Sequence, residues 1–540
     1  MVYSVSHQSV LQTSRNGWRR TASSNLSHIW GGGNMISAKR DMPVESKGPI
    51  SAIYHGRAIV PCTVDPEEHH YLEWFKCRTS VKLPGLFASP YWRTLVFQAS
   101  VEEPAVRHAM VALSTVHKTG VSSGDRLGAR DRTPCRDEKL MLQHYNKAIS
   151  ALQDHSKIKD RSSTRVVLVT CVLFVCLELL QGHCQTAREH LRSGVAVITA
   201  YKTANHRPFD DEIVAELSAL HSRIALLYPD DPGISNDTRM LPTSMPCSVN
   251  QFKASLDSLL SRACGLAAQY HQRRVIGISS FHCELEHKQR ALINELFCWL
   301  QSYTTLRDCL PTNVPLYDKL GDCLLRSHHA MASIMAARSF EGPGEDTSSC
   351  TAEFTSILAH SIPLSVLRRS SQFETMHNKL YGSPTPDSTN NVVDMGWIPP
   401  LFFTATKCRM PHIRFQAIRL LERSPHCEGA WVATTIAAIA RKIMQMEDPK
   451  SYDRLHKDVD FAWEALPVAE QCESDILEEW RIIHELQVIL PDDPLGAVVV
   501  RCERKKTSGE WECVKITYDV VDGRWSDEKL VALPQAAEGC

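Results

Sequence analysis

One short motif in the sequence has the spacing of a catalytic nucleophile. Residues 120–124 read GVSSG, which matches the Gly-x-Ser-x-Gly pattern of serine hydrolases. That pattern requires a sharp turn from a strand into a helix, whereas the residues before this motif have helical periodicity. A flexible loop after a helix is therefore the better interpretation.

Cysteine and histidine, the common zinc ligands, gather at two places in the chain. Cys283 and His287 would share one helix face, but two ligands on one helix do not complete a zinc site. His183, Cys184 and His190 lie around a predicted helix–helix turn, where simple packing explains them. The chain contains 24 histidines, so chance proximity of such residues is expected.

Acid–base chemistry has three further candidate pairs, each of two adjacent residues. These are Glu67-Glu68, His69-His70 and Asp230-Asp231. No spacing fixes a partner for any of them, and a solvated helix start and an acidic loop account for their presence. We find no phosphate-binding glycine pattern and no His-Glu-x-x-His motif. The sequence therefore predicts no catalytic, cofactor-binding or metal-binding residues, and a protein that is not an enzyme.

The cysteines and the charge exclude several other classes of protein. The 19 cysteines include no Cys-x-x-Cys pair, and the tightest spacing is that of Cys171 and Cys176 in an apolar helical stretch. Dispersed, reduced thiols are expected rather than a disulfide or zinc framework. The formal net charge of −1 gives no overall basic field for nucleic acid. The apolar run 166–177 is too short to cross a bilayer before Glu178, so no membrane segment is expected.

Helical patterns occupy most of the chain. Asp65-Pro66 marks a helix start, and 102–118 has the 3.6-residue apolar period of a helix. Residues 166–180 are apolar almost all round, which predicts a buried helix, and Gly182 then joins it to an antiparallel partner helix. Periodicity returns over 252–338 and 432–446, while 228–250, 341–351 and 382–400 have the composition of surface loops.

The two ends of the chain differ from this pattern. Residues 1–64 are rich in Ser, Asn and Gly and are predicted to be a disordered leader. Residues 497–504 and 510–520 are β-rich runs separated by a turn at 505–509, which predicts a hairpin that docks on the helices. The predicted fold is all-α, an array of antiparallel helices and helical hairpins over 65–495, with a small β-hairpin and tail over 496–540.

The stretch from Tyr71 to Lys118 closely resembles the opening of the fungal-specific transcription factor domain, the middle, regulatory region of fungal zinc-cluster (Zn2Cys6) transcription factors. The residues that carry the resemblance continue into the next two helices and recur near the C-terminus. They are Phe75, Thr79, Leu83, Gly85, Trp92, Leu95, Gln98, residues 103–109 (EPAVRHA), Ala112, Leu113, His117, Tyr145, Ala148, Ile149, Leu152, residues 179–182 (LLQG), Ala187, His190, Leu191, Gly194 and the helical region 417–431. Most fall on predicted core faces, so His108 and His117 are interpreted as packed or capping residues.

The resemblance implies a nuclear regulator of transcription, with a fungal secondary-metabolite gene cluster as the expected target. The zinc cluster that reads DNA in this family needs six closely spaced cysteines, and the first cysteine here is Cys62. We therefore expect DNA contact through a partner, such as another zinc-cluster factor, unless a cluster is encoded upstream of this sequence. The alternative is a helical interaction scaffold with no role in transcription.

Overall fold

The computed structural model describes most of the chain between residues 65 and 531. The described ranges are 65–87, 89–119, 136–156, 160–205, 209–228, 246, 248–276, 282–309, 315–338, 350–370, 395–423, 426–467, 479–493 and 495–531. The predicted leader 1–64, the GVSSG motif, Asp230-Asp231 and the final residues 532–540 lie outside them.

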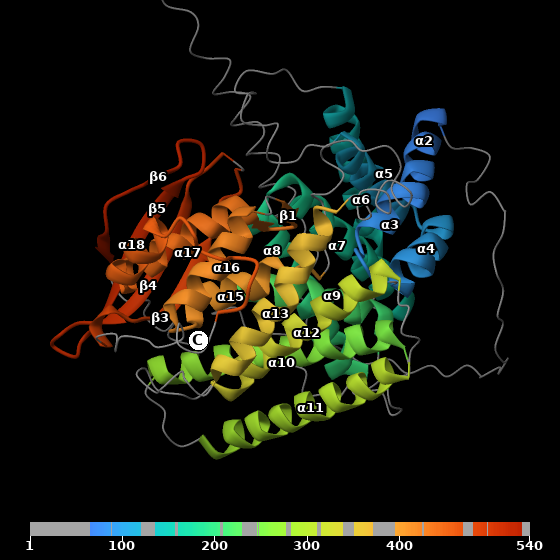
Figure 1. Cartoon of the computed structure of the whole chain (residues 1–540). Helices are drawn as coiled ribbons and strands as arrows, with labels where there is room; N and C mark the ends of the chain where they lie inside the picture. Colours follow the sequence, from blue (N-terminus) through green and yellow to red (C-terminus); the bar gives the residue numbers. More distant parts are fainter. Residues whose placement is uncertain are drawn as a thin grey trace, which may run out of the picture.

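The first part of the described chain is helical and lies at the right and rear of Figure 1. Two π-helical turns, η1 and η2, interrupt its opening segment. The elements are α2 (Pro66–Trp74), η1 (Phe75–Thr79), α3 (Ser80–Lys82), η2 (Tyr91–Leu95), α4 (Val96–Glu102), α5 (Pro104–Thr119), α6 (Arg136–Ser156), α7 (Arg161–Gln181), α8 (Cys184–Asn205) and α9 (Asp211–Ala225).

The second part continues with long helices and ends in a sheet at the left of Figure 1. Its helices are α10 (Val249–Ile276), α11 (His282–Asp308), α12 (Leu316–Ala337), α13 (Thr351–Arg368), α15 (Ile398–Lys407), α16 (Pro411–Arg423), α17 (Ala433–Glu447), α18 (Pro449–Lys457) and the 3-10 turn η7 (Glu479–Arg481). Its strands are β1 (Cys427–Glu428), β2 (Trp431–Val432), β3 (Ile483–Ile489), β4 (Val498–Lys505), β5 (Trp511–Asp519), β6 (Arg524–Trp525) and β7 (Lys529–Val531).

The predicted helix starts and stripes are confirmed. The Asp65 carboxylate accepts a hydrogen bond from the Glu67 N–H at 3.2 Å, and Pro66 occupies the first turn of α2, where its missing N–H costs nothing. In α5, the predicted stripe residues Val106, Met110 and Leu113 are buried. This face packs on α6 and α7.

Helix α7 is the buried helix expected from its composition. By length and mean hydropathy it is apolar enough to cross a membrane, but 89% of its most apolar window is buried inside the protein. Gly182 ends α7 in the left-handed conformation at φ 78° and turns the chain into α8, forming the predicted αα-hairpin. Gly194 lets the two helices approach closely, because a Cβ atom there would lie 2.8 Å from the Cys171 Sγ.

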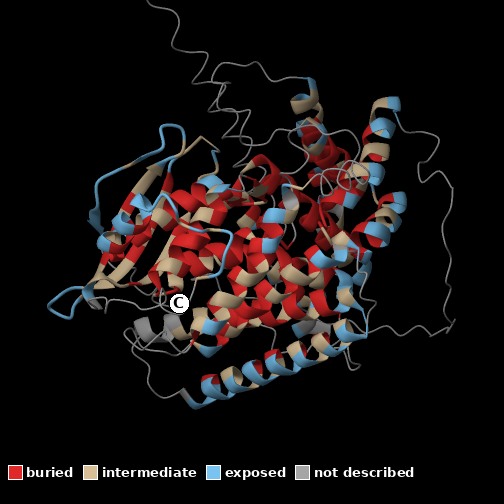
Figure 2. Ribbon diagram, viewed as in Figure 1, coloured by how far each residue is buried: buried red, intermediate tan, exposed pale blue. Residues whose placement is uncertain are grey.

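A single hydrophobic core connects both parts of the chain. It runs without interruption from Tyr71 in α2 to Ile516 in β5. Figure 2 shows buried residues through the centre of the molecule, whereas the long helix α11 is exposed along its outer face. The helices and the sheet therefore fold around one core.

The C-terminal sheet contains the predicted hairpin and more. Strands β4 and β5 pair antiparallel as expected, with Gly509 in the turn at φ 85°. Strand β3 was not predicted, since it lies within the range expected to be helical, yet it pairs antiparallel with β4. The sheet order is β3-β4-β5-β6, with β7 also paired to β5.

Backbone and side-chain hydrogen bonds hold β3 and the residues after it against the end of α9 and the start of α8. The Val488 N–H in β3 donates to the Leu227 carbonyl at 3.2 Å, and the Leu490 N–H donates to the Tyr228 hydroxyl at 3.1 Å. Asp492 accepts from the Gln185 N–H (2.8 Å) and the Thr186 N–H (3.0 Å), which caps the start of α8. Val500 and Ile516 of the predicted hairpin belong to the same hydrophobic core as the helices, which confirms that the hairpin docks on them.

A buried ion-pair network joins helix α17 to the same sheet. The Glu447 carboxylate accepts from Arg414 at 2.6 Å, from Arg409 at 2.7 Å and from the Ile483 N–H at 2.7 Å. Glu447 and Arg414 are almost completely buried. Removing either partner would therefore leave a charged group without water and without its full set of hydrogen bonds.

Two segments near α15 differ from the sequence prediction. The predicted loop 382–400 ends in the first turn of α15, because Pro399 and Pro400 are tolerated where a helix needs no N–H donor. The predicted helical region 417–431 breaks after Arg423, where β1 and β2 form a short hairpin around Gly429 at φ 62°. Glu428 of this hairpin accepts from the Trp397 and Ile398 N–H groups at 3.0 and 3.1 Å, which caps α15.

Candidate functional site

The described residue group best placed for chemistry lies where α2, α5 and α6 meet. The Nδ1 atoms of His108 on α5 and His144 on α6 are 3.1 Å apart. The Nε2 atom of His144 is 3.6 Å from a Glu68 carboxylate oxygen on α2, and the Lys147 ammonium is 3.7 Å from the same oxygen. Packing of α2 and α6 on α5 brings these residues together from three separate helices.

Both histidines of this group are held in the neutral form. Burial lowers the pKa of His144 to about 4, with further lowering from His108 and Lys147. Burial also lowers the pKa of His108, although Glu68 opposes the shift. At pH 7 each imidazole therefore keeps one nitrogen lone pair that can accept a hydrogen bond or bind a metal ion.

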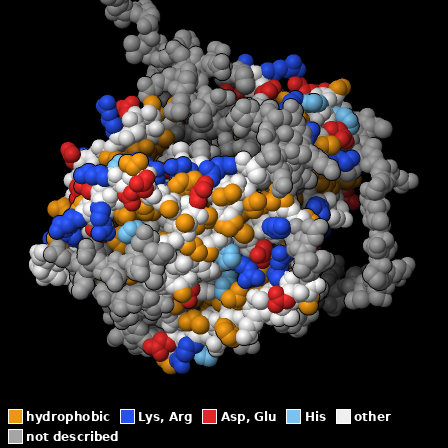
Figure 3. All heavy atoms as spheres, in the orientation of Figure 1, with side chains coloured by type: hydrophobic (Ala, Val, Ile, Leu, Met, Phe, Trp, Pro, Cys, Tyr) orange, Lys and Arg blue, Asp and Glu red, His pale blue; other side chains and the backbone are white. Residues whose placement is uncertain are grey.

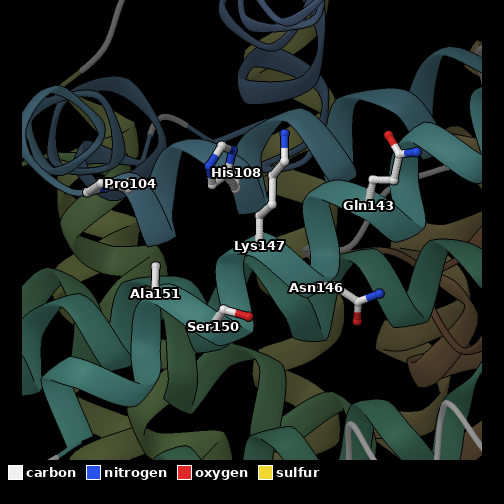
Figure 4. A pocket seen from close by; sticks show the side chains of 7 residues that line it. All are labelled: Pro104, His108, Gln143, Asn146, Lys147, Ser150 and Ala151. Atoms are coloured by element: carbon white, nitrogen blue, oxygen red, sulfur yellow. The ribbon is translucent and has the colours of Figure 1, made fainter.

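An open pocket of about 530 Å³ adjoins the histidine pair. Figure 4 shows His108 and Lys147 side by side at this pocket, on neighbouring helices. Its lining consists of Pro104, His108, Gln143, Asn146, Lys147, Ser150 and Ala151. The pocket is wide open to solvent, and His108 and Lys147 are the lining residues that also take part in the histidine group.

The other histidines that drew attention in the sequence have structural partners. The His117 Nδ1 is 2.9 Å from the Thr79 hydroxyl, and burial together with the Lys82 charge lowers the His117 pKa to about 3. The His183 Nδ1 is 2.7 Å from Glu178, and the His190 Nε2 is 3.0 Å from the Tyr145 hydroxyl. These contacts agree with the packed interpretation of His117, His183 and His190.

The structure does not assemble the suspected zinc ligands of α11. Cys283 and His287 are both exposed, and within the described part of the chain neither belongs to a group of three ligating side chains. The group of this kind found there is Glu68, His108 and His144. Sequence reasoning considered Glu68 and His108 separately and missed His144, because no local spacing links residues that stand 36 positions apart on two helices.

Figure 3 shows how charged side chains are distributed on one face of the molecule. Lys and Arg side chains form a row across the upper left of this view, and acidic and hydrophobic side chains lie beside it. Among the described residues, Arg409 pairs with Glu447 and Arg504 with Glu512, and these side chains are at most 20% exposed.

Comparison with known proteins agrees with the resemblance seen in the sequence. A family model described as the fungal specific transcription factor domain matches residues 77–349. The chain is similar to the aspercryptin biosynthesis cluster-specific transcription regulator atnN of Emericella nidulans, at 33% identity over 26% of this chain and 22% of the relative. It is also similar to the transcription regulator lscL of Purpureocillium lilacinum, at 23% identity over 34% of this chain and 41% of the relative.

These matches therefore span less than half the length of either relative. No solved structure matches the chain. The matched family region begins in η1, contains α5 to α12 and ends just before α13. It includes His108, His144 and the α7–α8 hairpin, whereas Glu68 in α2 precedes it. Because the family model covers half of the 540 residues, the chain belongs to the fungal-specific transcription factor domain family.

Proposed function

We propose that this fungal transcription regulator acts through protein contacts of its helical domain and reaches promoters through a partner. The observation that carries the proposal is the family match over 77–349 in a sequence whose 540 residues contain no Cys-x-x-Cys pair. The family's zinc-cluster module needs such closely spaced cysteines. The proposed partner is another regulator with its own zinc cluster, and the proposed site of action is the nucleus.

The target proposed is a secondary-metabolite gene cluster. One relative, atnN, is named as the regulator specific to the aspercryptin biosynthesis cluster. Both relatives are named transcription regulators, which favours a regulator over a helical scaffold without a role in transcription. We further propose that the chain catalyses no reaction, since histidines and carboxylates among its described residues take part in caps, ion pairs and helix contacts.

A DNA-binding measurement tests the proposal that the chain reaches promoters through a partner. We expect the purified full chain to bind promoter DNA weakly, with a steep dependence on salt and equal competition by scrambled DNA. The physical reason is that sequence discrimination requires side chains held against base edges in a groove, whereas contacts to phosphates alone carry no sequence information. An electrophoretic shift assay at physiological salt measures this.

The control is the same promoter DNA with a purified zinc-cluster factor, which should bind in a sequence-dependent manner under identical conditions. Nanomolar binding of this chain to one promoter, with scrambled DNA failing to compete, would contradict the proposal. It would show that the chain has a DNA-reading element of its own.

A further inference from the structure

We propose that Glu68, His108 and His144 form a binding site for a divalent transition-metal ion, with Zn²⁺ as the best match. Each residue offers one ligand atom, and these three atoms all lie within 4.8 Å of one another. The proposal does not depend on the proposed function, since a metal could join these helices in a protein of any role.

The distance between the histidines fits two ligands of one ion. Two nitrogens that bind the same tetrahedral Zn²⁺ at its usual bond length are roughly 3.3 Å apart. The Nδ1 atoms of His108 and His144 are 3.1 Å apart. Glu68 faces the other nitrogen of the His144 ring, at 3.6 Å from Nε2, so this imidazole must turn or bind through Nε2 for all three residues to hold one ion.

The alternative to a metal is a hydrogen bond between two neutral imidazoles. His108 would then donate from Nδ1 to the His144 Nδ1, and the His144 Nε2–H would face Glu68. At 3.6 Å the contact between Nε2 and the Glu68 oxygen is too long for a good hydrogen bond. A metal ion held by Glu68 and by one nitrogen of each imidazole would replace both of these contacts.

The chemistry of the ligands selects the kind of ion. Two imidazoles with one carboxylate suit zinc, cobalt or nickel, whereas calcium and magnesium prefer sites made of oxygen atoms alone. The open pocket beside His108 gives an ion a path from solvent to the group. Such a site would fix α2 against the α5–α6 pair.

Lys147 provides a test of this arrangement because its charge opposes the metal. Its ammonium lies 3.7 Å from the Glu68 oxygen that would bind the ion. A metal would have to compete with Lys147 for this carboxylate and tolerate a nearby positive charge. Lys147→Met should therefore tighten metal binding, by roughly tenfold for a change of 1.4 kcal/mol.

The experiment is a zinc titration of the metal-stripped full chain in competition with a coloured chelator, followed by Co²⁺ absorption spectroscopy. We expect one site that is lost in the triple variant E68Q/H108Q/H144Q. Glu68→Gln alone should weaken binding at least about tenfold.

The triple variant also serves as the baseline for zinc held by the exposed cysteines, such as Cys283 and Cys298. The matched control is His155→Gln on α6, whose histidine pairs with Glu103 instead, and it should bind as the parent chain does.

Folding of each variant is checked by circular dichroism. If the triple variant does not fold, Glu68→Gln and Lys147→Met still decide the question. The first should weaken zinc binding and the second should tighten it. Equal zinc binding by the parent, Glu68→Gln and Lys147→Met chains would overturn the proposal. It would leave the two histidines as a hydrogen-bonded pair without a metal.

Discussion

Replacing Glu447 with alanine is expected to lower the free energy of unfolding by about 3–5 kcal/mol. The carboxylate pairs with the buried Arg414 and with Arg409, and it accepts the Ile483 N–H at the start of β3. Without it, a buried guanidinium and a buried backbone donor lose their partner. Urea denaturation of the full chain, followed by circular dichroism, measures the loss as a lower midpoint.

The control for this substitution is Glu284→Ala, which removes a glutamate from an exposed ion pair. Glu284 pairs with Lys288 at 2.8 Å on α11, and its side chain is 53% exposed. Exposed pairs contribute about 0–1 kcal/mol, so the control should unfold close to the parent chain. Equal effects of the two substitutions would contradict the role assigned to Glu447.

The same carboxylate should make stability depend on pH. Burial by itself would raise the pKa of Glu447, but Arg414, Arg409 and the Ile483 N–H outweigh burial and hold it below the usual value of 4.5. A group whose pKa is lower in the folded state stabilises the protein above its unfolded-state pKa. That contribution is present above about pH 4.5 and is lost as the pH falls through the lowered folded-state pKa. Glu447→Ala should therefore lose stability less steeply on acidification than the parent chain.

Replacing Gly396 with alanine is the second change with a large expected effect. We expect it to lower the free energy of unfolding by about 3 kcal/mol, because buried polar groups lose their hydrogen-bond partners. A Cβ atom at position 396 would overlap the carboxylate of Glu428. That carboxylate is buried and is held by His426 at 2.8 Å and by the Trp397 and Ile398 N–H groups that open α15. It cannot move away without losing these bonds. Thermal denaturation of the full chain measures the cost.

A double-mutant cycle with Glu428→Ala separates this overlap from a general effect of alanine on the loop. Once the carboxylate is gone, the added methyl group has space, so Gly396→Ala should cost much less in the Glu428→Ala background. Additive effects of the two substitutions would show that the methyl group and the carboxylate do not compete for the same space.

Local periodicity was sufficient to predict the long helices. In α5 and α17 the apolar residues repeat every three or four positions, and these stripes are buried. Burial also extends beyond the stripes, since every residue from Ala109 to Val116 in α5 is buried. Helix α7 is apolar on all sides and is buried on nearly all sides. The apolar pattern therefore predicts where these helices lie, whereas neighbouring helices decide how much of each one is covered.

The elements that the sequence failed to predict depend on contacts between distant residues. Strand β3 has a burial pattern that does not alternate strictly, and its structure comes from pairing with β4 and from the Leu227 carbonyl. The hairpin of β1 and β2 turns at Gly429, and the Glu428 carboxylate of this hairpin caps the separate helix α15. The residues of the histidine group likewise come from three helices. Residue type alone drew attention to Glu68 and His108, but no spacing in the sequence indicated that they lie close together.

The central claim, that this chain regulates transcription when another module brings it to DNA, is tested most directly by a tethering measurement. The full chain is fused to an unrelated DNA-binding domain and expressed in a fungal host with a reporter that contains the matching site. We predict that reporter transcription changes relative to the DNA-binding domain alone, and that the chain without the fused domain leaves the reporter unchanged. A folded, nuclear fusion that occupies the site and leaves transcription unaltered would contradict the account.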